Sequence, residues 1–138
     1  MTDSTVNNKS LSIRVCSNGL SFCVYSPTDD EPFTYKELDI NHTISLAANL
    51  KQALADEPLL QSDYQRVNVM VTTPHFTTVP VSVFDKEQLD SVYQTVFPKD
   101  NNSHVSYNVL RRSGIAIVFG LDKNVYQLLK DDFPRARF

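Results

Sequence analysis

The sequence predicts an α+β or mixed α/β fold, and three features of its 138 residues point to that class. An Asn18-Gly19 pair separates two apolar runs rich in β-branched residues, which is the strongest short-range signal for a β-hairpin. Apolar residues between Thr43 and Leu54 recur at helical spacing instead. Strand and helix patterns then alternate along the chain, so that the predicted order is βββα followed by ββαββα.

Composition excludes several classes of function. The formal net charge is −3 and the sequence pI is about 5.5, so no domain-wide basic surface exists to neutralise phosphates. Nucleic acid is therefore excluded as the principal partner. No apolar run approaches the roughly 20 residues that a transmembrane segment needs, and residues 1–10 form no secretory signal. With only two cysteines and no export signal, the chain is expected to be cytoplasmic.

The first two strands are expected over Leu11–Val15 and Leu20–Tyr25. Because asparagine and glycine both accept the positive φ of a type I′ turn, the Asn-Gly pair is expected at the two turn positions. Counting outward from that turn sets Cys16 opposite Ser21. The period of two along each strand then gives the hairpin one core face, made of Ile13, Val15, Phe22 and Val24.

A third strand is expected over Phe33–Ile40, where apolar and polar residues alternate. The helical pattern that follows ends before Pro58, since proline disfavours helical geometry in the residue that precedes it. Its length corresponds to a helix of about three to four turns. The apolar residues of this helix are Ile44, Ala47, Ala48, Leu50, Ala53 and Leu54.

Two valine-rich runs, Arg66–Thr72 and Phe76–Phe84, predict the next pair of strands. Pro80 lies within the second run, and proline has no N–H to give to a ladder, so this strand is expected at a sheet edge or with a bulge. Asp85 then opens a helix that ends at Pro98. The apolar face of this helix consists of Leu89, Val92, Tyr93 and Val96.

The last part of the chain predicts a second hairpin and a final helix. Val105–Leu110 and Ile115–Phe119 flank Arg111–Gly114, a spacing typical of two antiparallel neighbours. Asp122 is placed to cap the helix, which ends before Pro134. Its apolar residues are Val125, Leu128 and Leu129.

Two stretches of this sequence resemble a known family. They are the run from Leu11 through Cys16-Ser17-Asn18-Gly19 to Tyr25 and the run Phe76–Lys86. Both are similar to the beginning of a family of uncharacterised bacterial proteins with an actin-like ATPase fold, related to the pilus-assembly and cell-division actin homologues. The resemblance implies an RNase H-like βββα lobe with a strand-helix-strand-strand module inserted after its fourth strand.

The resemblance also implies a division of the chain. Residues 11–75 are expected to form the RNase H-like βββαβ core, and residues 76–138 the inserted module with its return segment. Residues 1–10 carry one lysine and no apolar stretch, so they are expected to form a disordered arm. Because the likeness reaches only the first half of such proteins, we expect the chain to be the N-terminal half of a longer protein. An independent small α+β binding domain unrelated to actin is the alternative.

In actin-like ATPases the first hairpin contacts nucleotide phosphates, so the resemblance implies nucleotide-binding residues at Ser17, Asn18, Gly19 and Ser21. This hairpin has one glycine and no acid, whereas phosphate and Mg²⁺ need a closely approaching backbone and a carboxylate. We therefore expect no catalytic residue, no metal site and no cofactor in this chain alone. ATP with Mg²⁺ is the alternative, at a site that a second lobe completes.

The interpretation that we favour is protein association or self-association. An edge strand offers unpaired backbone groups beside apolar side chains, which is a template for strand addition. The expected contact residues are Phe76, Val79, Val81, Val83, Arg111 and Arg112.

Other candidates are interpreted as structural. Cys16 and Cys23 share a predicted face but lack a metal or redox spacing, so we interpret them as packed side chains. His42, His75 and His104 lie on three separate elements, which favours capping or surface roles.

Overall fold

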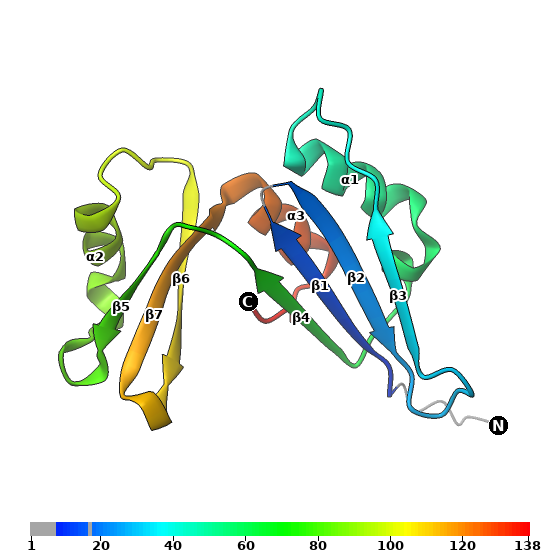
Figure 1. Cartoon of the computed structure of the whole chain (residues 1–138), viewed down its shortest axis with the longest axis horizontal. Coiled ribbons are helices and arrows are strands. Elements are labelled where there is room, and N and C mark those ends of the chain that lie inside the picture. Colours follow the sequence, from blue (N-terminus) through cyan, green and yellow to red (C-terminus); the bar gives the residue numbers. More distant parts are fainter. Residues whose placement is uncertain (1–7, 17) are drawn as a thin grey trace. The chain divides into compact units, whose positions relative to one another are not determined.

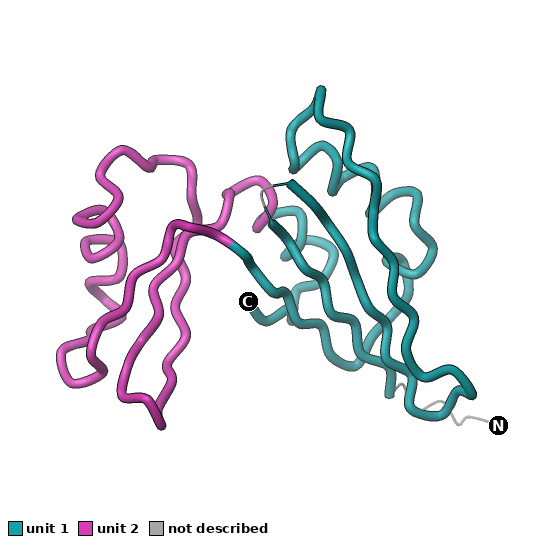
Figure 2. Tube along the Cα trace, in the orientation of Figure 1, with its two compact units in different colours: residues 1–72, 127–138 teal, residues 73–126 magenta. Residues whose placement is uncertain are grey.

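The computed structural model describes residues 8–16 and 18–138. The chain divides into two compact units (Figure 2). Unit 1 contains the described residues up to Thr72 together with Gln127–Phe138, and unit 2 contains Thr73–Tyr126. Of the predicted N-terminal arm, residues 1–7 lie outside the described part, Lys9 C=O accepts a hydrogen bond from Gln65 N–H, and Ser10 begins the first strand.

Unit 1 is built on a four-stranded sheet in the order β3-β2-β1-β4. The neighbours β1–β2 and β2–β3 are antiparallel, and β4 runs parallel to β1 (Figure 1). A parallel neighbour requires a crossover, which the helix α1 supplies. The strands are β1 Ser10–Cys16, β2 Gly19–Tyr25, β3 Phe33–Leu38 and β4 Arg66–Val71.

The unit 1 sheet buries one face. Side chains alternate between buried and more accessible along β1, as the period of two requires, and along β2 except at Ser21, which is buried as well. In Figure 1, α1 and the part of α3 that belongs to unit 1 lie behind the sheet. The predicted core face is confirmed, because the buried residues include Leu11, Ile13, Val15, Leu20, Phe22, Val24, Val67 and Val69.

The predicted register of the first hairpin is wrong by two residues. Cys16 pairs with Gly19, and Arg14 rather than Cys16 lies opposite Ser21. Gly19 is therefore the first residue of β2, not a turn residue, and its φ is not positive. A shift of two residues leaves every side chain on its original face, so the hydrophobic pattern is satisfied by both registers.

The helix α1 spans Leu46–Asp56 and begins at Ser45, whose side chain accepts a hydrogen bond from Ala48 N–H. Besides Leu50 and Leu54 it buries Asn49, which the apolar pattern did not mark. The Asn49 side-chain oxygen accepts a hydrogen bond from Asn41 N–H at 2.8 Å. Its side-chain nitrogen donates to the carbonyl oxygens of Asn41 and Ser45. A 3₁₀ turn, Pro58–Gln61, then leads toward β4.

The chain returns to unit 1 through α3, Lys123–Asp132, whose first turn is capped by the Asp122 carboxylate. Beyond this helix Arg137 forms a parallel bridge with Asn68 of β4. Val69 N–H donates to Arg137 C=O at 2.7 Å, and Arg137 N–H donates to Val67 C=O at 3.0 Å. These contacts extend the ladder of the sheet beyond β4.

Unit 2 has the predicted strand-helix-strand-strand order. Its antiparallel sheet has the order β5-β7-β6 (Figure 1). A tight hairpin joins β6 to β7 through Arg111–Ser113 and Gly114, where φ is 67° and glycine avoids steric strain. The elements are β5 Phe76–Pro80, α2 Leu89–Val96, β6 Ser103–Leu110 and β7 Ile115–Asp122.

The fifth strand is shorter than predicted. It ends at Pro80, and Val81–Val83 forms a 3₁₀ turn instead of continuing to Phe84. Val81 N–H donates to Gly114 C=O, which turns the chain across the end of the sheet. The expectation of an edge strand is confirmed, because within the part of the chain that the structure describes β5 pairs only with β7. Among the residues described, no helix has both the length and the apolar character needed to span a membrane.

Candidate functional site

The residues that the resemblance assigned to a nucleotide lie at the turn end of β1 and β2. There the surface has a hollow of about 540 Å³, which we call the hairpin hollow. The β1–β2 hairpin forms one wall and the end of β3 with the residues after it forms the other. Its polar and charged lining residues include Arg14, Asn18, Ser21, Glu37, Asp39 and His42, with Gly19 among its other residues.

One cross-strand row sets the charges of the hairpin hollow. Ser21 of β2 lies opposite Arg14 on one side and opposite Glu37 on the other. Residues directly opposite in neighbouring strands project to the same face of a sheet. The row therefore presents a guanidinium and a carboxylate on either side of a buried serine.

The hairpin itself presents oxygen atoms. Cys16 Sγ lies 3.5 Å from Asn18 Oδ1 and 3.4 Å from Gly19 O, so the thiol is the donor to both. Phosphate oxygens need hydrogen-bond donors. The Asn18 side-chain oxygen and the Gly19 carbonyl oxygen are acceptors, and both face the Cys16 thiol. Ser17, the remaining residue of the predicted set, lies outside the described residues.

Sequence reasoning missed two acids of this site. It excluded a carboxylate because the hairpin carries none, but Glu37 and Asp39 reach the hollow from β3 and the residues after it. The signal was available in the pairing of β2 with β3, which sets Glu37 opposite Ser21. Within the described part of the chain, no group of three or more His, Cys, Asp or Glu residues is arranged to hold a metal ion.

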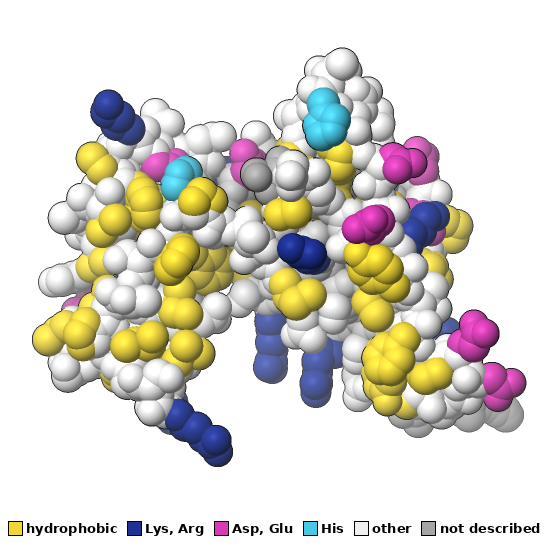
Figure 3. Space-filling model, viewed as in Figure 1, with side chains coloured by type: hydrophobic (Ala, Val, Ile, Leu, Met, Phe, Trp, Pro, Cys, Tyr) yellow, Lys and Arg dark blue, Asp and Glu magenta, His cyan; other side chains and the backbone are white. Residues whose placement is uncertain are grey.

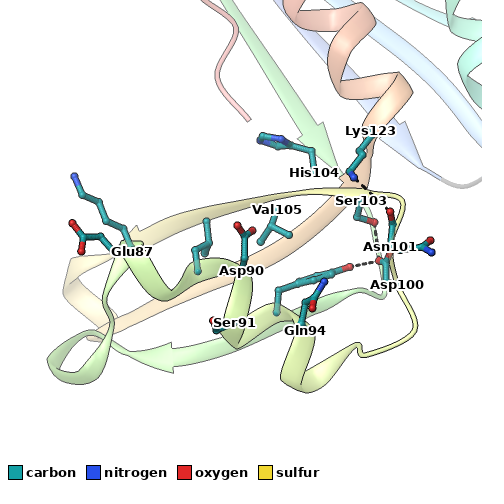
Figure 4. A pocket seen from close by; sticks show the side chains of 13 residues that line it. Glu87, Asp90, Ser91, Gln94, Asp100, Asn101, Ser103, His104, Val105 and Lys123 are labelled. Atoms are coloured by element: carbon teal, nitrogen blue, oxygen red, sulfur yellow. Dashed lines mark hydrogen bonds between the residues drawn. The ribbon is translucent and has the colours of Figure 1, made fainter.

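Unit 2 has a second hollow, of about 680 Å³, between α2 and the start of β6 (Figure 4). Its polar centre is Asp100, in the loop before β6. The carboxylate accepts hydrogen bonds from the Tyr93 hydroxyl, from Ser103 Oγ at 2.7 Å and from Asn102 N–H at 3.1 Å. His75 Nδ1 lies 3.5 Å from the same carboxylate. We call Asp100 and these four partners the Asp100 cluster. Its hydrogen bonds join α2, the loop after it and β6.

Burial and these contacts shift the acidity of two groups. Burial, together with the hydrogen bond to Asp100, raises the pKa of Tyr93 to about 12. Burial alone would raise the pKa of the Asp100 carboxyl, but the hydrogen bonds from Tyr93, Ser103 and Asn102, with the charge of His75, lower it below its ordinary value. The pair therefore stays a phenol and a carboxylate at neutral pH.

A glycine makes this arrangement possible. A Cβ atom at Gly120 of β7 would lie 2.2 Å from the Tyr93 hydroxyl oxygen and 2.6 Å from Cζ of the same ring. Only a residue without a side chain lets the ring lie across β7 and reach Asp100. We interpret the Asp100 cluster as structural, because every contact in it joins elements of unit 2.

The predicted partner residues separate into two places. Val81 and Val83 lie in the 3₁₀ turn whose first N–H bonds to Gly114, next to the hairpin that carries Arg111 and Arg112. Phe76 is 53% exposed but begins β5 and is far along the strand from that turn. Val79 is half-buried. Exposed Leu110, which sequence reasoning did not select, ends β6 beside the two arginines.

Comparison with known proteins supports the fold. The family model described as Protein of unknown function (DUF3822) matches residues 1–138. A crystal structure from Bacteroides thetaiotaomicron, described as a protein with actin-like ATPase fold and unknown function, matches with a TM-score of 0.84 and 34% sequence identity. The match covers 96% of this chain and 51% of that one, so this chain spans about half the length of the solved protein. None of the curated proteins matches.

These matches confirm two predictions from the sequence. The resemblance to an uncharacterised family with an actin-like ATPase fold is correct. The predicted fold class, an RNase H-like βββα lobe with an inserted strand-helix-strand-strand module, is correct as well.

Proposed function

The chain belongs to the family described as Protein of unknown function (DUF3822), and for this member we propose a non-catalytic role in protein association or assembly. The contact surface that we assign is the end of unit 2 where the 3₁₀ turn and the β6–β7 hairpin meet. We call this surface the unit 2 tip, and it consists of Val81, Val83, Leu110, Arg111 and Arg112.

The observation that carries the proposal is the exposure of apolar side chains next to two cations. Val83 is 71% exposed, Leu110 is 42% exposed and Val81 is 38% exposed. Arg111 and Arg112 are exposed beside them. Arginine is enriched in protein contact surfaces, whereas lysine and acidic residues are depleted there. The arginines also select for carboxylates on the partner, which they bind through two parallel hydrogen bonds.

The test is site-specific photo-crosslinking in cells that naturally make the protein. A photo-reactive residue at position 83 should give one discrete protein adduct, which mass spectrometry identifies as a partner or as a second copy. Reversing both charges with Arg111→Glu and Arg112→Glu should remove that adduct. A photo-reactive residue at the exposed position of Lys99, in the loop after α2, is the matched control. Equal adducts from both positions, or none from position 83, would contradict the proposal.

A second candidate function rests on the hairpin hollow. The hollow combines one cation, Arg14, with two carboxylates, Glu37 and Asp39, beside Asn18 and Gly19. Carboxylates of this kind are ligands for Mg²⁺, and a cation is suited to a phosphate oxygen. The single glycine and the oxygens facing Cys16 fit a phosphate poorly, so nucleotide binding would depend on a second lobe.

Calorimetry with Mg-ATP separates the two functions. We expect no heat of binding with this chain. A longer polypeptide that carries a second lobe would bind Mg-ATP if the hollow is half of a nucleotide site, and Asp39→Asn should then weaken binding. Asp131→Asn, an exposed acid of α3, provides the control. Absence of heat with the longer polypeptide would remove the nucleotide-binding candidate.

A cytoplasmic location is part of the proposal. Cys16 and Cys23 are both free thiols, each half-buried in unit 1. Free thiols persist in the reducing cytoplasm. Fractionation of cells that make the protein would test this location.

A further inference from the structure

The sheet of unit 1 ends in an edge strand of unusual accessibility. Among the described residues, the order β3-β2-β1-β4 gives β3 a strand neighbour on one side only. All of Phe33–Glu37 is exposed, and the strand contains neither proline nor glycine. By contrast β5, the edge strand that the sequence singled out, is one residue shorter and ends in Pro80. Natural proteins usually protect an edge of this kind, because it can pair with another chain.

The backbone of β3 alternates between groups that face β2 and groups that face outward. Ser26 N–H donates to Pro32 C=O at 2.7 Å, which identifies these two residues as a hydrogen-bonded antiparallel pair. Every second residue after Pro32 therefore faces β2, namely Thr34, Lys36 and Leu38. The residues between them direct both N–H and C=O away from the sheet. These residues are Phe33, Tyr35 and Glu37.

Aromatic side chains extend over the accessible face of the same edge. Phe33 is 66% exposed and Tyr35 is 62% exposed. The Phe33 ring lies 4.8 Å from the ring of Tyr25, its cross-strand neighbour on β2. Figure 3 shows apolar side chains gathered over the β2–β3 end of the unit 1 sheet, with acidic side chains at their margin. A strand added to β3 would place alternate side chains against these rings.

The charge around β3 is strongly negative. Lys36 is the only cation of segment 29–39, and its Nζ lies 2.5 Å from Glu57 Oε2 of the same unit. The cation is therefore already neutralised. The acids of the segment are Asp29, Asp30, Glu31, Glu37 and Asp39.

A small hollow lies on the opposite face of the edge, between the end of β3 and α1. Its volume is about 200 Å³, and we call it the edge hollow. Three carboxylates line it, those of Asp39, Asp56 and Glu57, beside the apolar side chain of Leu38. Glu57 is already paired with Lys36, which leaves Asp39 and Asp56 to meet an added cation. A lysine or arginine side chain suits such a hollow, because its methylene stem packs on apolar atoms while its charge meets the carboxylates.

We propose that β3 accepts an extended, basic segment of a partner protein by strand addition. Side chains on one face of the added strand are apolar and pack on Phe33 and Tyr35. Side chains on its other face are lysine or arginine, and one of them enters the edge hollow. Main-chain hydrogen bonds to Phe33, Tyr35 and Glu37 supply affinity, and the alternation of apolar and basic residues supplies specificity. This surface lies in unit 1 and is independent of the unit 2 tip.

The test uses the whole chain and an eight-residue probe peptide in which valine and lysine alternate. Two peptides serve as controls: one replaces every lysine with glutamate, and one replaces a central valine with proline, which removes a ladder N–H. We expect the first peptide to bind and to shift the backbone NMR signals of Phe33–Leu38. Both control peptides should bind at least about tenfold more weakly.

Protein variants separate strand addition from general attraction to an acidic protein. Asp39→Lys with Asp56→Lys should weaken binding of the valine-lysine peptide about tenfold. Glu87→Lys with Asp90→Lys changes the net charge equally, but in unit 2, and should leave the affinity near that of the unmodified chain. Equal losses in both variants, NMR shifts outside β3 and its neighbours, or equal binding of the proline peptide would overturn the proposal. None of these results depends on Arg111 or Arg112, so the role of the unit 2 tip is tested separately.

Discussion

The two units stabilise their cores in different ways. In unit 1 the largest fully buried side chains are apolar, among them Leu11, Phe22 and Leu50. In unit 2 the largest is Tyr93, whose hydroxyl bonds to the Asp100 carboxylate. A small unit buries less apolar surface per residue, so directed polar contacts carry more of its stability. We therefore expect the stability of unit 1 to respond mainly to lost side-chain volume, and that of unit 2 to lost hydrogen bonds and to pH.

The largest effect is expected from removing volume in unit 1. Phe22→Ala should lower the free energy of unfolding by about 3–5 kcal/mol, because it removes a 1% exposed side chain and leaves a cavity. Urea unfolding followed by circular dichroism measures the change. Phe33→Ala makes the same substitution at a 66% exposed position and should change stability by less than about 0.5 kcal/mol. Similar losses from both would contradict the apolar core assigned to unit 1.

The next effect tests the close approach in unit 2. Gly120→Ala should destabilise by about 1–3 kcal/mol, because the new methyl group collides with the Tyr93 hydroxyl. Adding Tyr93→Phe should recover part of the loss, since it removes the atom nearest to the methyl group. If the changes in the free energy of unfolding, measured with urea, simply add in the double variant, then the two side chains do not contact each other.

Removing the hydroxyl alone has a smaller expected effect. Tyr93→Phe leaves the Asp100 carboxylate without one of its donors and should cost about 1.5 kcal/mol. Tyr35→Phe removes a hydroxyl that bonds to exposed Glu37 at 3.3 Å and serves as the matched control. Its effect on the urea midpoint should be close to zero. A loss as large as that of Tyr93→Phe would contradict the role of burial.

The smallest effect is a dependence on pH. The folded-state pKa of Asp100 is lowered from its ordinary value of 3.8, so its contribution to stability is present above that value. The contribution is lost as the pH falls through the lower, folded-state pKa. Asp100→Asn should therefore destabilise near pH 6, and its difference from the unmodified chain should shrink below about pH 4. Urea midpoints across this range measure it, and Asp132→Asn, an exposed acid, should show no such trend. A difference that stays constant with pH would contradict the lowered pKa.

The order of elements could be predicted from the sequence because each core face has a simple period. Alternation in β1 and β2 and helical spacing in α1 identify which residues are buried, independently of their partners. The hairpin register could not be predicted this way, since both registers bury the same face. Asn49 is also invisible to a hydrophobic pattern, because its burial depends on bonds to the backbone of Asn41 and Ser45.

The candidate sites were only partly predictable for a related reason. The resemblance assigned Asn18, Gly19 and Ser21 as a set, and these three residues lie close together in the sequence. Glu37 and Asp39 join them only through the pairing of β2 with β3. The contact of Tyr93 with Asp100 depends in turn on Gly120, which lies in β7. Contacts of this kind require knowledge of which strands are neighbours.

The hydrogen bond from Gly120 N–H to His75 C=O, 3.0 Å long, joins the beginning and the end of the segment that builds most of unit 2. A segment whose two ends are neighbours acts as a cassette. It can be lengthened, shortened or exchanged while the chain enters and leaves at one fixed spacing. In this chain His75 and Gly120 therefore mark a junction at which one module could be exchanged for another.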